Sequence, residues 1–162
     1  MKRQKVYLDT SIINFLFAED APDFKKVTVD FFENYVRQKV YEVFVSDVVV
    51  KEILKTQDLT KREKLLSVIR DYNLEMLQLD KEGERLANVY IAGKVIPENK
   101  IEDAQHIGIS TVQQMDVLLS WNFKHLANIN KKLKIKFINE REGYFYPLDL
   151  LTPLELMYEN EN

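Results

Sequence analysis

The sequence predicts a three-layer α/β domain in which helices cover both faces of a parallel sheet. Short runs of β-branched and aromatic residues recur along the chain and indicate strands. Stretches with helical spacing of apolar residues separate these runs, and they are long enough to cross over between parallel strands. The 162 residues fit one domain, which would bury roughly two thirds of the surface of its unfolded chain.

Five segments are expected as strands, namely 5–9, 42–46, 74–78, 116–120 and 135–138. Helical spacing predicts helices over 11–18, 23–39, 48–55, 60–71, 81–92, 101–113 and 123–131. Thr60 with Glu63 and Asn99 with Glu102 form capping boxes, which predict that helices begin just after Thr60 and Asn99. We expect one domain over residues 1–158 and a polar, fraying tail over 159–162.

The composition excludes several classes of protein. Met1-Lys2-Arg3-Gln4 leads directly into a strand-like run and cysteine is absent, which favours a cytoplasmic protein without a secretion signal. No apolar run approaches the roughly 20 residues that a membrane-spanning helix needs. With four glycines there is no phosphate-binding loop, and a net charge of −3 requires any nucleic-acid contact to be local or mediated by metal ions.

Acidic and amide side chains fall at the positions where an α/β sheet binds ligands. Asp9 ends the first expected strand and Asn122 follows the fourth, and ligands bind beyond the carboxyl ends of parallel strands. Glu52 lies in the helix after the second strand, and Asp103 lies in the first turn of the helix that enters the fourth. Carboxylates gathered there repel one another unless a divalent cation neutralises them, and Mg²⁺ or Mn²⁺ prefers such oxygen ligands.

Four segments in order carry a resemblance to a known family. "VYLDTSIINFL", "SDVVVKEI", "EDAQHIGIST" and "DVLLSWNFKHLAN" resemble the successive signature blocks of the PIN domain, and within it the VapC-like toxin ribonucleases of prokaryotes. The likeness covers the chain from residue 6 to about 138. It implies five parallel strands in the order 3-2-1-4-5 and cleavage of RNA that depends on Mg²⁺ or Mn²⁺. It also implies a homodimer and an antitoxin protein as partner.

The resemblance implies a set of catalytic and metal-binding residues. Asp9, Glu52 and Asp103 match the first three acids of the family pattern, while Asn122 stands where the family often has Asp. Asn keeps a carbonyl oxygen but lacks the charge, which weakens the binding of a second ion. Asp116 does not replace it, because six residues of strand place it roughly 20 Å away at the opposite edge of the sheet.

Each candidate also has a purely structural interpretation. Asp9 and Asn122 are good helix caps, Glu52 is typical of a solvated helix face, and Asp103 suits the positive end of a helix dipole. The alternative for Thr10, which with Ser11 we expect to orient Asp9, is likewise a cap.

Other side chains near the expected site are weaker candidates. We expect His106 to be a packed histidine bonded to backbone and Trp121 to pack rather than to stack on a base. RNA contacts are conceivable for Lys51, Lys55, Lys124 and His125.

Two further alternatives and one surface remain open. The first alternative is a PIN-like module without catalytic activity that binds RNA or a protein, which Asn122 favours. The second is a phosphoacceptor receiver domain, for which Asp80 is the single candidate acceptor. The segment 21–40 is richer in apolar residues than one helix face needs, which indicates either a surface for a second subunit or antitoxin, or packing inside the monomer.

Overall fold

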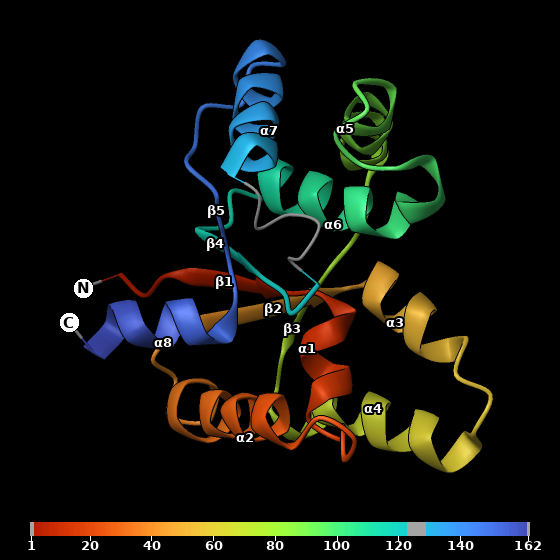
Figure 1. Cartoon of the computed structure of the whole chain (residues 1–162), viewed down its shortest axis with the longest axis vertical. Coiled ribbons are helices and arrows are strands. Elements are labelled where there is room, and N and C mark those ends of the chain that lie inside the picture. Colours follow the sequence, from red (N-terminus) through yellow and green to blue (C-terminus); the bar gives the residue numbers. More distant parts are fainter. Residues whose placement is uncertain (1, 123–128, 162) are drawn as a thin grey trace.

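The computed structural model describes residues 2–122 and 129–161. Within these ranges five parallel strands form a sheet in the order β3-β2-β1-β4-β5, with helices on both faces (Figure 1). The predicted class and strand order are therefore confirmed. The strands are β1 (Lys5–Leu8), β2 (Glu42–Ser46), β3 (Glu75–Leu77), β4 (Val117–Leu119) and β5 (Asp149–Leu151).

The helices occupy most of the remaining described chain. They are α1 (Thr10–Phe15), α2 (Pro22–Phe31) with the π-helical turn η1 (Phe32–Val36), α3 (Asp47–Leu54), α4 (Leu59–Asp71), α5 (Lys81–Ala92), the 3₁₀ turn η2 (Glu98–Lys100), α6 (Ile101–Val112), α7 (Ile129–Arg141) and α8 (Pro153–Glu161). None of the described helices is both long and apolar enough to span a membrane.

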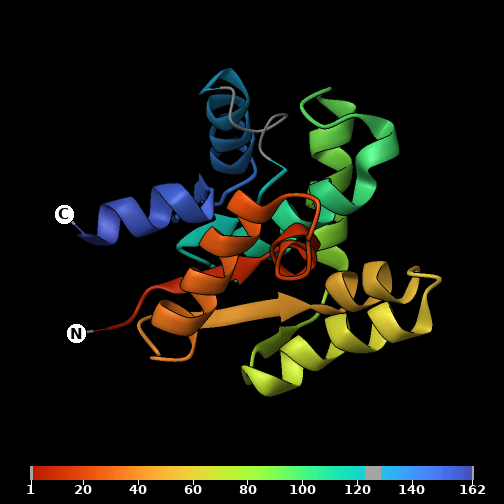
Figure 2. The same ribbon diagram turned by 60° about the horizontal axis from the view of Figure 1, so that its bottom comes forward.

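The sheet lies between two helical layers. Helices α5, α6 and α7 lie on one side of the sheet, and α1, α2, α4 and α8 lie on the other (Figure 1). Figure 2 shows β2 running directly into α3, so that α3 begins at the carboxyl end of its strand. Both α1 and α3 therefore start at the edge of the sheet where ligands bind in this class of fold.

The central strand explains why the N-terminal run is so apolar. Val6, Tyr7 and Leu8 are fully buried because β1 has a neighbouring strand on each side and a helical layer on each face. Strands of parallel sheets that are covered on both faces carry continuous apolar runs rather than alternating ones. The run in β1 ends at Asp9, where the sheet ends.

The prediction of the fifth strand was wrong. Residues 135–138 belong to α7, and the fifth strand is β5, which pairs in parallel with β4. Ile135 and Ile138 are buried at a spacing of three, which suits one face of a helix. In this segment lysine alternates with apolar residues, which is the two-residue period expected of a strand.

The start of α4 also differs from the expectation. Its cap is Asp58, whose Oδ1 accepts hydrogen bonds from the backbone N–H groups of Thr60 (3.0 Å) and Lys61 (3.2 Å). The expected capping box at Thr60 is therefore wrong, although the helix begins within two residues of the expected position. Before α6 the chain forms η2, and Lys100 at the cap position makes no side-chain capping bond. Residues 123–128 of the helix expected over 123–131 lie outside the described residues.

Helices α5 and α6 cross at two glycines. A Cβ atom placed on Gly108 would overlap the backbone carbonyl oxygen of Gly83. The two backbones therefore pass in direct contact, which only glycine permits at position 108. This crossing fixes the position of α6, which carries Asp103 in its first turn.

Candidate active site

Asp9 lies at the carboxyl edge of the sheet between β1 and β4. Its backbone N–H donates to the carbonyl of Leu119 (3.2 Å), which ties it to the end of β4. Its Oδ1 accepts from the backbone N–H of Ser11 (3.0 Å) and from the Ser11 hydroxyl (2.5 Å), so Asp9 also caps α1. The residue is only 5% exposed. Both interpretations given to Asp9 are thus compatible, because the capping bonds engage one oxygen.

The electrostatic environment of Asp9 disfavours its ionised form. Burial raises the pKa of the Asp9 carboxyl above its ordinary value, and the charge of Asp103 adds to this effect. The charge of His106 and the hydroxyls of Ser11 and Ser120 lower the pKa but do not outweigh burial. A second positive charge near Asp9 would therefore stabilise the carboxylate.

Glu52 reaches the same region from α3 and is held by two hydrogen bonds. Its Oε1 accepts from the Thr10 hydroxyl (2.7 Å) and lies 2.6 Å from His106 Nε2. Burial raises the pKa of Glu52, but the hydrogen bond and charge of His106, together with the Thr10 bond, lower it below its ordinary value overall. Glu52 is therefore ionised at neutral pH. Thr10, which we expected to orient Asp9, orients Glu52 instead, while Ser11 orients Asp9 as expected.

His106 was misjudged from the sequence. It is buried as expected, but its partners are side chains rather than backbone: Nε2 contacts Glu52, and Nδ1 lies 2.6 Å from the Tyr7 hydroxyl. The Tyr7 hydroxyl in turn lies 2.7 Å from Ser46 Oγ. Burial lowers the pKa of His106, but Glu52, Asp9 and Asp103 raise it above its ordinary value overall. The surrounding acids thus favour the protonated, cationic form of His106.

Asp103 is half-buried in the first turn of α6. Burial raises the pKa of its carboxyl, as does the charge of Glu52, while His106 and Lys100 act in the opposite direction without outweighing burial. The structure shows no hydrogen bond or ion pair between the Asp103 side chain and any described residue. Its oxygens are therefore available to a ligand.

Asn122 follows β4 on the same edge of the sheet and is exposed. Its backbone N–H donates to Ser120 Oγ (2.9 Å), and the N–H of Trp121 donates to Ser11 Oγ (2.9 Å). These bonds hold the end of β4 against the residues that orient Asp9. Trp121 packs as expected: its ring lies 4.8 Å from that of Phe24, and its Nε1 donates to Thr28.

The described residues contain no group of three or more His, Cys, Asp or Glu side chains placed to hold one metal ion together. The expected convergence of three acids is thus only partly realised: the charge of Asp103 acts on Asp9 and that of Glu52 acts on Asp103, but Glu52 also binds His106. Two desolvated carboxylates nevertheless fit a hard divalent ion, because Mg²⁺ often uses one or two carboxylates and completes its shell with water and phosphate oxygens.

The basic residues near the site are only partly free for RNA. Lys55 Nζ binds Glu102 Oε1 (2.8 Å), whereas Lys51 is exposed on α3. Lys124 and His125 lie outside the described residues.

Asp116 and Asp80 have structural roles. Asp116 accepts from the backbone N–H of Lys5 (2.8 Å) at the opposite edge, and Asp80 caps α5 by accepting from Gly83 N (2.8 Å).

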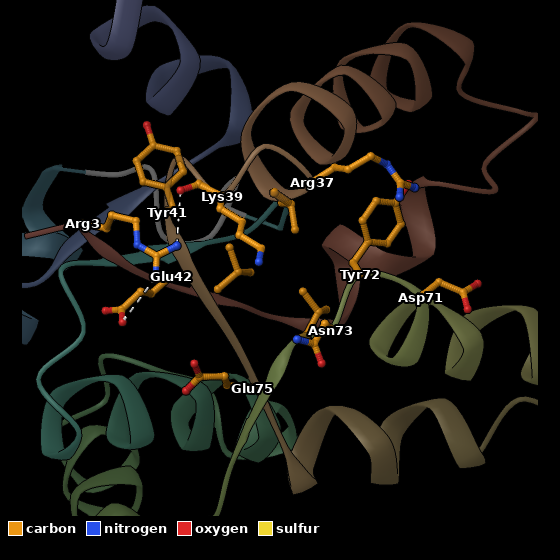
Figure 3. A pocket seen from close by; sticks show the side chains of 12 residues that line it. Arg3, Arg37, Lys39, Tyr41, Glu42, Asp71, Tyr72, Asn73 and Glu75 are labelled. Carbon is orange, nitrogen blue, oxygen red and sulfur yellow. Dashed lines mark hydrogen bonds and ion pairs between the residues drawn. The ribbon is translucent and has the colours of Figure 1, made fainter.

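A hollow of about 430 Å³ lies at the opposite edge of the sheet, beside the starts of β2 and β3 (Figure 3). Its arginines already have partners. Arg3 lies 3.9 Å from Glu42, and the Arg37 guanidinium lies over the Tyr72 ring at 4.7 Å. Arg37 also binds Glu33 (2.6 Å). This hollow contains none of the candidate acids and is separate from the candidate active site.

No family model matches this sequence, and no curated protein matches it either. Solved structures do match. VapBC2 from Rickettsia felis, bound to a DNA fragment from its promoter, aligns over 91% of this chain and 98% of its own, with a TM-score of 0.56 and 12% identity. VapC20 from Mycobacterium tuberculosis, a toxin that cleaves the sarcin-ricin loop, aligns over 75% of this chain and 93% of its own, with a TM-score of 0.59 and 12% identity.

A third structure, VapBC-5 from Mycobacterium tuberculosis, belongs to the VapBC family of toxin-antitoxin systems. It aligns over 91% of this chain and 98% of its own, with a TM-score of 0.50 and 12% identity. This chain thus shares its overall fold with these proteins despite low sequence identity. The chain therefore has the fold of a VapC-like PIN domain.

Proposed function

We propose that this protein is a metal-dependent endoribonuclease and the toxin of a toxin-antitoxin pair. The observation that carries the proposal is Asp9: a carboxylate buried at the carboxyl edge of the central strand, with a pKa raised by burial and by Asp103. Such a pair of acids favours a bound cation. The shared fold with VapC20, a toxin that cleaves the sarcin-ricin loop, supports RNA as the substrate class.

The ion would be held by oxygen ligands from four elements of the chain. Asp9 and Asp103 supply the two carboxylates that the structure leaves electrostatically unsatisfied, and Glu52 and Asn122 complete the proposed set. Mg²⁺ or Mn²⁺, when bound, supplies activation of a water molecule and neutralises charge that develops on the scissile phosphate. Because Asn122 is neutral, the set carries three negative charges, which favours one ion over two.

The other residues of the site position these ligands. Ser11 fixes Asp9, and Thr10 and His106 fix Glu52. His106 also neutralises part of the acidic charge while the ion is absent, which allows the acids to be buried together. Lys51, exposed on α3 beside Glu52, would contact the RNA backbone.

The proposed antitoxin would bind the surface of α2. Within the expected apolar segment, Phe31, Phe32 and Val36 are core residues of the monomer, but Phe24 (46% exposed) and Val29 (37% exposed) remain on the surface. A homodimer stays part of the proposal. Size-exclusion chromatography with light scattering measures it directly.

Cleavage assays on purified protein test the proposal. We expect Mn²⁺ to support cleavage of a sarcin-ricin stem-loop RNA or of a single-stranded RNA pool, and EDTA to abolish it. Asp9→Asn and Asp103→Asn should each lower the rate about a hundredfold or more, while Asp116→Asn, a matched acid at the opposite edge, should cleave like the wild type. Activity that survives Asp9→Asn would overturn the proposal.

A PIN-like module without catalytic activity is the second candidate function. The Glu52–His106 contact favours it, because the imidazole of His106 already binds one of the three acids, and Asn122 stands in place of a fourth. Calorimetric titration with Mn²⁺ distinguishes the two. Binding that requires Asp9 and Asp103 but produces no cleavage of any RNA would assign the site to a structural ion.

A further inference from the structure

Helix α7 has apolar side chains on two opposite faces. Ile135 and Ile138 are buried against the domain, at 3% and 5% exposure. Ile129, Leu133 and Phe137, spaced four residues apart, are 70%, 57% and 64% exposed. A helix on the surface of a domain normally carries one apolar stripe, which faces the core. The second stripe, here called the outer stripe (Ile129, Leu133 and Phe137), is not covered by any described part of the chain.

The outer stripe stands between two hollows. On one side Leu133 and Phe137 border a hollow of about 550 Å³ that extends to Val95 after α5. On the other side a hollow of about 370 Å³ separates the helix from the segment before β5, where Phe145 is 74% exposed. A ridge of side chains between two grooves is the surface on which another helix packs its own ridges. Figure 1 shows α7 standing at the end of the molecule, where a partner has access to it.

Positive charge flanks the outer stripe on both sides. At about 100° per residue, Lys132 and Lys136 lie on one side of the stripe and Lys134 and Arg141 on the other. The same division appears in the two hollows. Lys134 and Arg141 line the larger one, which has no acidic residue in its lining. Lys132 and Lys136 line the smaller one together with Glu140 and Asp149, so its basic row is the weaker of the two. None of these three lysines forms an ion pair with a residue that the structure describes. Arg141 lies 3.6 Å from Glu142.

We infer that the outer stripe of α7 docks an acidic amphipathic helix of a partner protein. Apolar residues of that helix fill the hollows, and carboxylates along its two flanks pair with the two basic rows. This is recognition of a helix in a groove, with the charges determining which helices bind. The inference is independent of the proposed nuclease activity, since α7 carries none of the candidate ligands.

The charges argue against the other occupants of this face. In a two-fold pair of α7 helices a flank meets its own copy if the helices are antiparallel and the other flank if they are parallel. Both flanks carry lysines, so lysines would face basic residues in either case. A flat bilayer would leave the hollows on either side of the stripe unfilled. RNA phosphates would bind the lysines, but RNA binding would not explain why the three residues of the outer stripe are apolar.

Fluorescence anisotropy on the full chain tests the inference with two labelled synthetic peptides. Both peptides are amphipathic helices with the same apolar stripe, which is flanked by Glu in one and by Lys in the other. We expect the acidic peptide to bind and the basic peptide not to bind. Leu133→Ser with Phe137→Ser, and separately Lys132→Glu with Lys136→Glu, should each weaken binding at least about tenfold.

Matched variants control for general surface effects. Leu154→Ser removes an equally exposed leucine (54%) from α8, and Lys61→Glu with Lys64→Glu reverses two exposed charges on α4. Both should bind the acidic peptide like the wild type, and circular dichroism should show that every variant is folded. Because the substituted side chains are exposed or, for Lys132, partly exposed, we expect no loss of fold.

Three outcomes overturn the inference. The first is equal binding of both peptides, or no binding of either at millimolar concentration. The second is a dimer, detected by analytical ultracentrifugation, that Leu133→Ser with Phe137→Ser dissociates, which assigns the face to a second copy of the chain. The third is binding of anionic vesicles or of RNA that the same variants abolish while peptide binding is absent.

Discussion

At the scale of single residues, the short contact between His106 and Glu52 shows how the acids are tolerated in a folded chain without an ion. His106 Nε2 is 2.6 Å from Glu52 Oε1, and the pKa of His106 is raised because Glu52, Asp9 and Asp103 together outweigh its burial. The acids favour the protonated imidazole, which reduces their mutual repulsion. A bound divalent ion would take over part of that role.

This contact predicts that the ion-free protein loses stability as the pH rises. A pKa raised in the folded state means that protonated His106 stabilises the fold, fully below its ordinary pKa of about 6.5 and progressively less as the pH rises through the raised value. Urea unfolding in EDTA should therefore give a lower free energy of unfolding at pH 9 than at pH 6. His106→Asn should flatten the profile. A flat wild-type profile would contradict the assignment.

The sequence predicts some of these residues better than others. Asp9 and Asn122 could be found because the end of a buried apolar run is a local feature of the sequence. The role of His106 could not, because its partners Glu52 and Tyr7 lie 54 and 99 residues away in the chain. The one local sign was its spacing of three from Asp103, which places both on neighbouring positions of one helix.

At the scale of elements, the crossing of α5 and α6 limits what position 108 can hold. Gly108→Ala should lower the free energy of unfolding by about 1–3 kcal/mol, because the added methyl overlaps the Gly83 carbonyl and forces the helices apart. Gly83→Ala should cost less, since its new methyl meets the flexible end of Leu79 at 3.0 Å. Urea unfolding of both variants measures the difference. Equal losses in the free energy of unfolding would show that the two helices move apart at little cost.

A buried polar network attaches α7 to the other helices of its layer. Asn139 Oδ1 accepts from the Tyr90 hydroxyl (2.5 Å), and its Nδ2 donates to Thr111 Oγ1 (3.1 Å). Asn139→Ala leaves two buried hydroxyls with fewer partners and should cost about 1–3 kcal/mol. In a double-mutant cycle with Tyr90→Phe the two losses should not add, because both remove the same bond. Additive losses would contradict a shared network.

The elements that were misread share a physical cause. Residues 135–138 alternate lysine with apolar side chains, which has the period of a strand, yet Ile135 and Ile138 also have the spacing of a helix face. The segment is a helix because Ile135 and Ile138 pack against the domain on one helical face. The true fifth strand, Asp149–Leu151, has three residues and relies on pairing with β4 rather than on its own pattern. Local propensity cannot identify so short a strand.

At the scale of the whole molecule, the proposed ion site predicts a stability that depends on metal. An ion that binds only the folded chain at a hundred times its Kd adds about 2.7 kcal/mol to the free energy of unfolding. For a chain of this size that raises Tm by roughly 5–10 °C. Thermal unfolding with Mn²⁺ and with EDTA measures the shift.

Asp9→Asn should make the protein less stable than the wild type in Mn²⁺ but more stable than the wild type in EDTA. It should remove the Mn²⁺ shift, yet the ion-free variant should unfold at a higher temperature than the ion-free wild type at pH 7, because it no longer carries a carboxylate whose pKa burial raises. Asn also remains a good cap for α1. A Mn²⁺ shift retained in this variant would move the ion site elsewhere.

The overall topology was the most predictable level. The α/β class followed from alternating patterns of residues, and the strand order came from the resemblance to VapC-like proteins rather than from the patterns themselves. Surfaces were the least predictable level. The apolar excess of 21–40 divided into core and exposed residues, and the outer stripe of α7 lay partly in a segment first taken for a strand.

The hydroxyl chain from Ser46 through Tyr7 to His106 has a consequence for how such a sequence can change. Tyr7 is fully buried, and its oxygen supports the imidazole that holds Glu52. Packing in the core constrains its ring, and the hydrogen bonds to Ser46 and His106 constrain its hydroxyl. Tyr7→Phe would preserve the packed volume and still leave the imidazole without its second hydrogen-bond partner. At this position, a substitution in the interior is therefore also a change in the chemistry of the site.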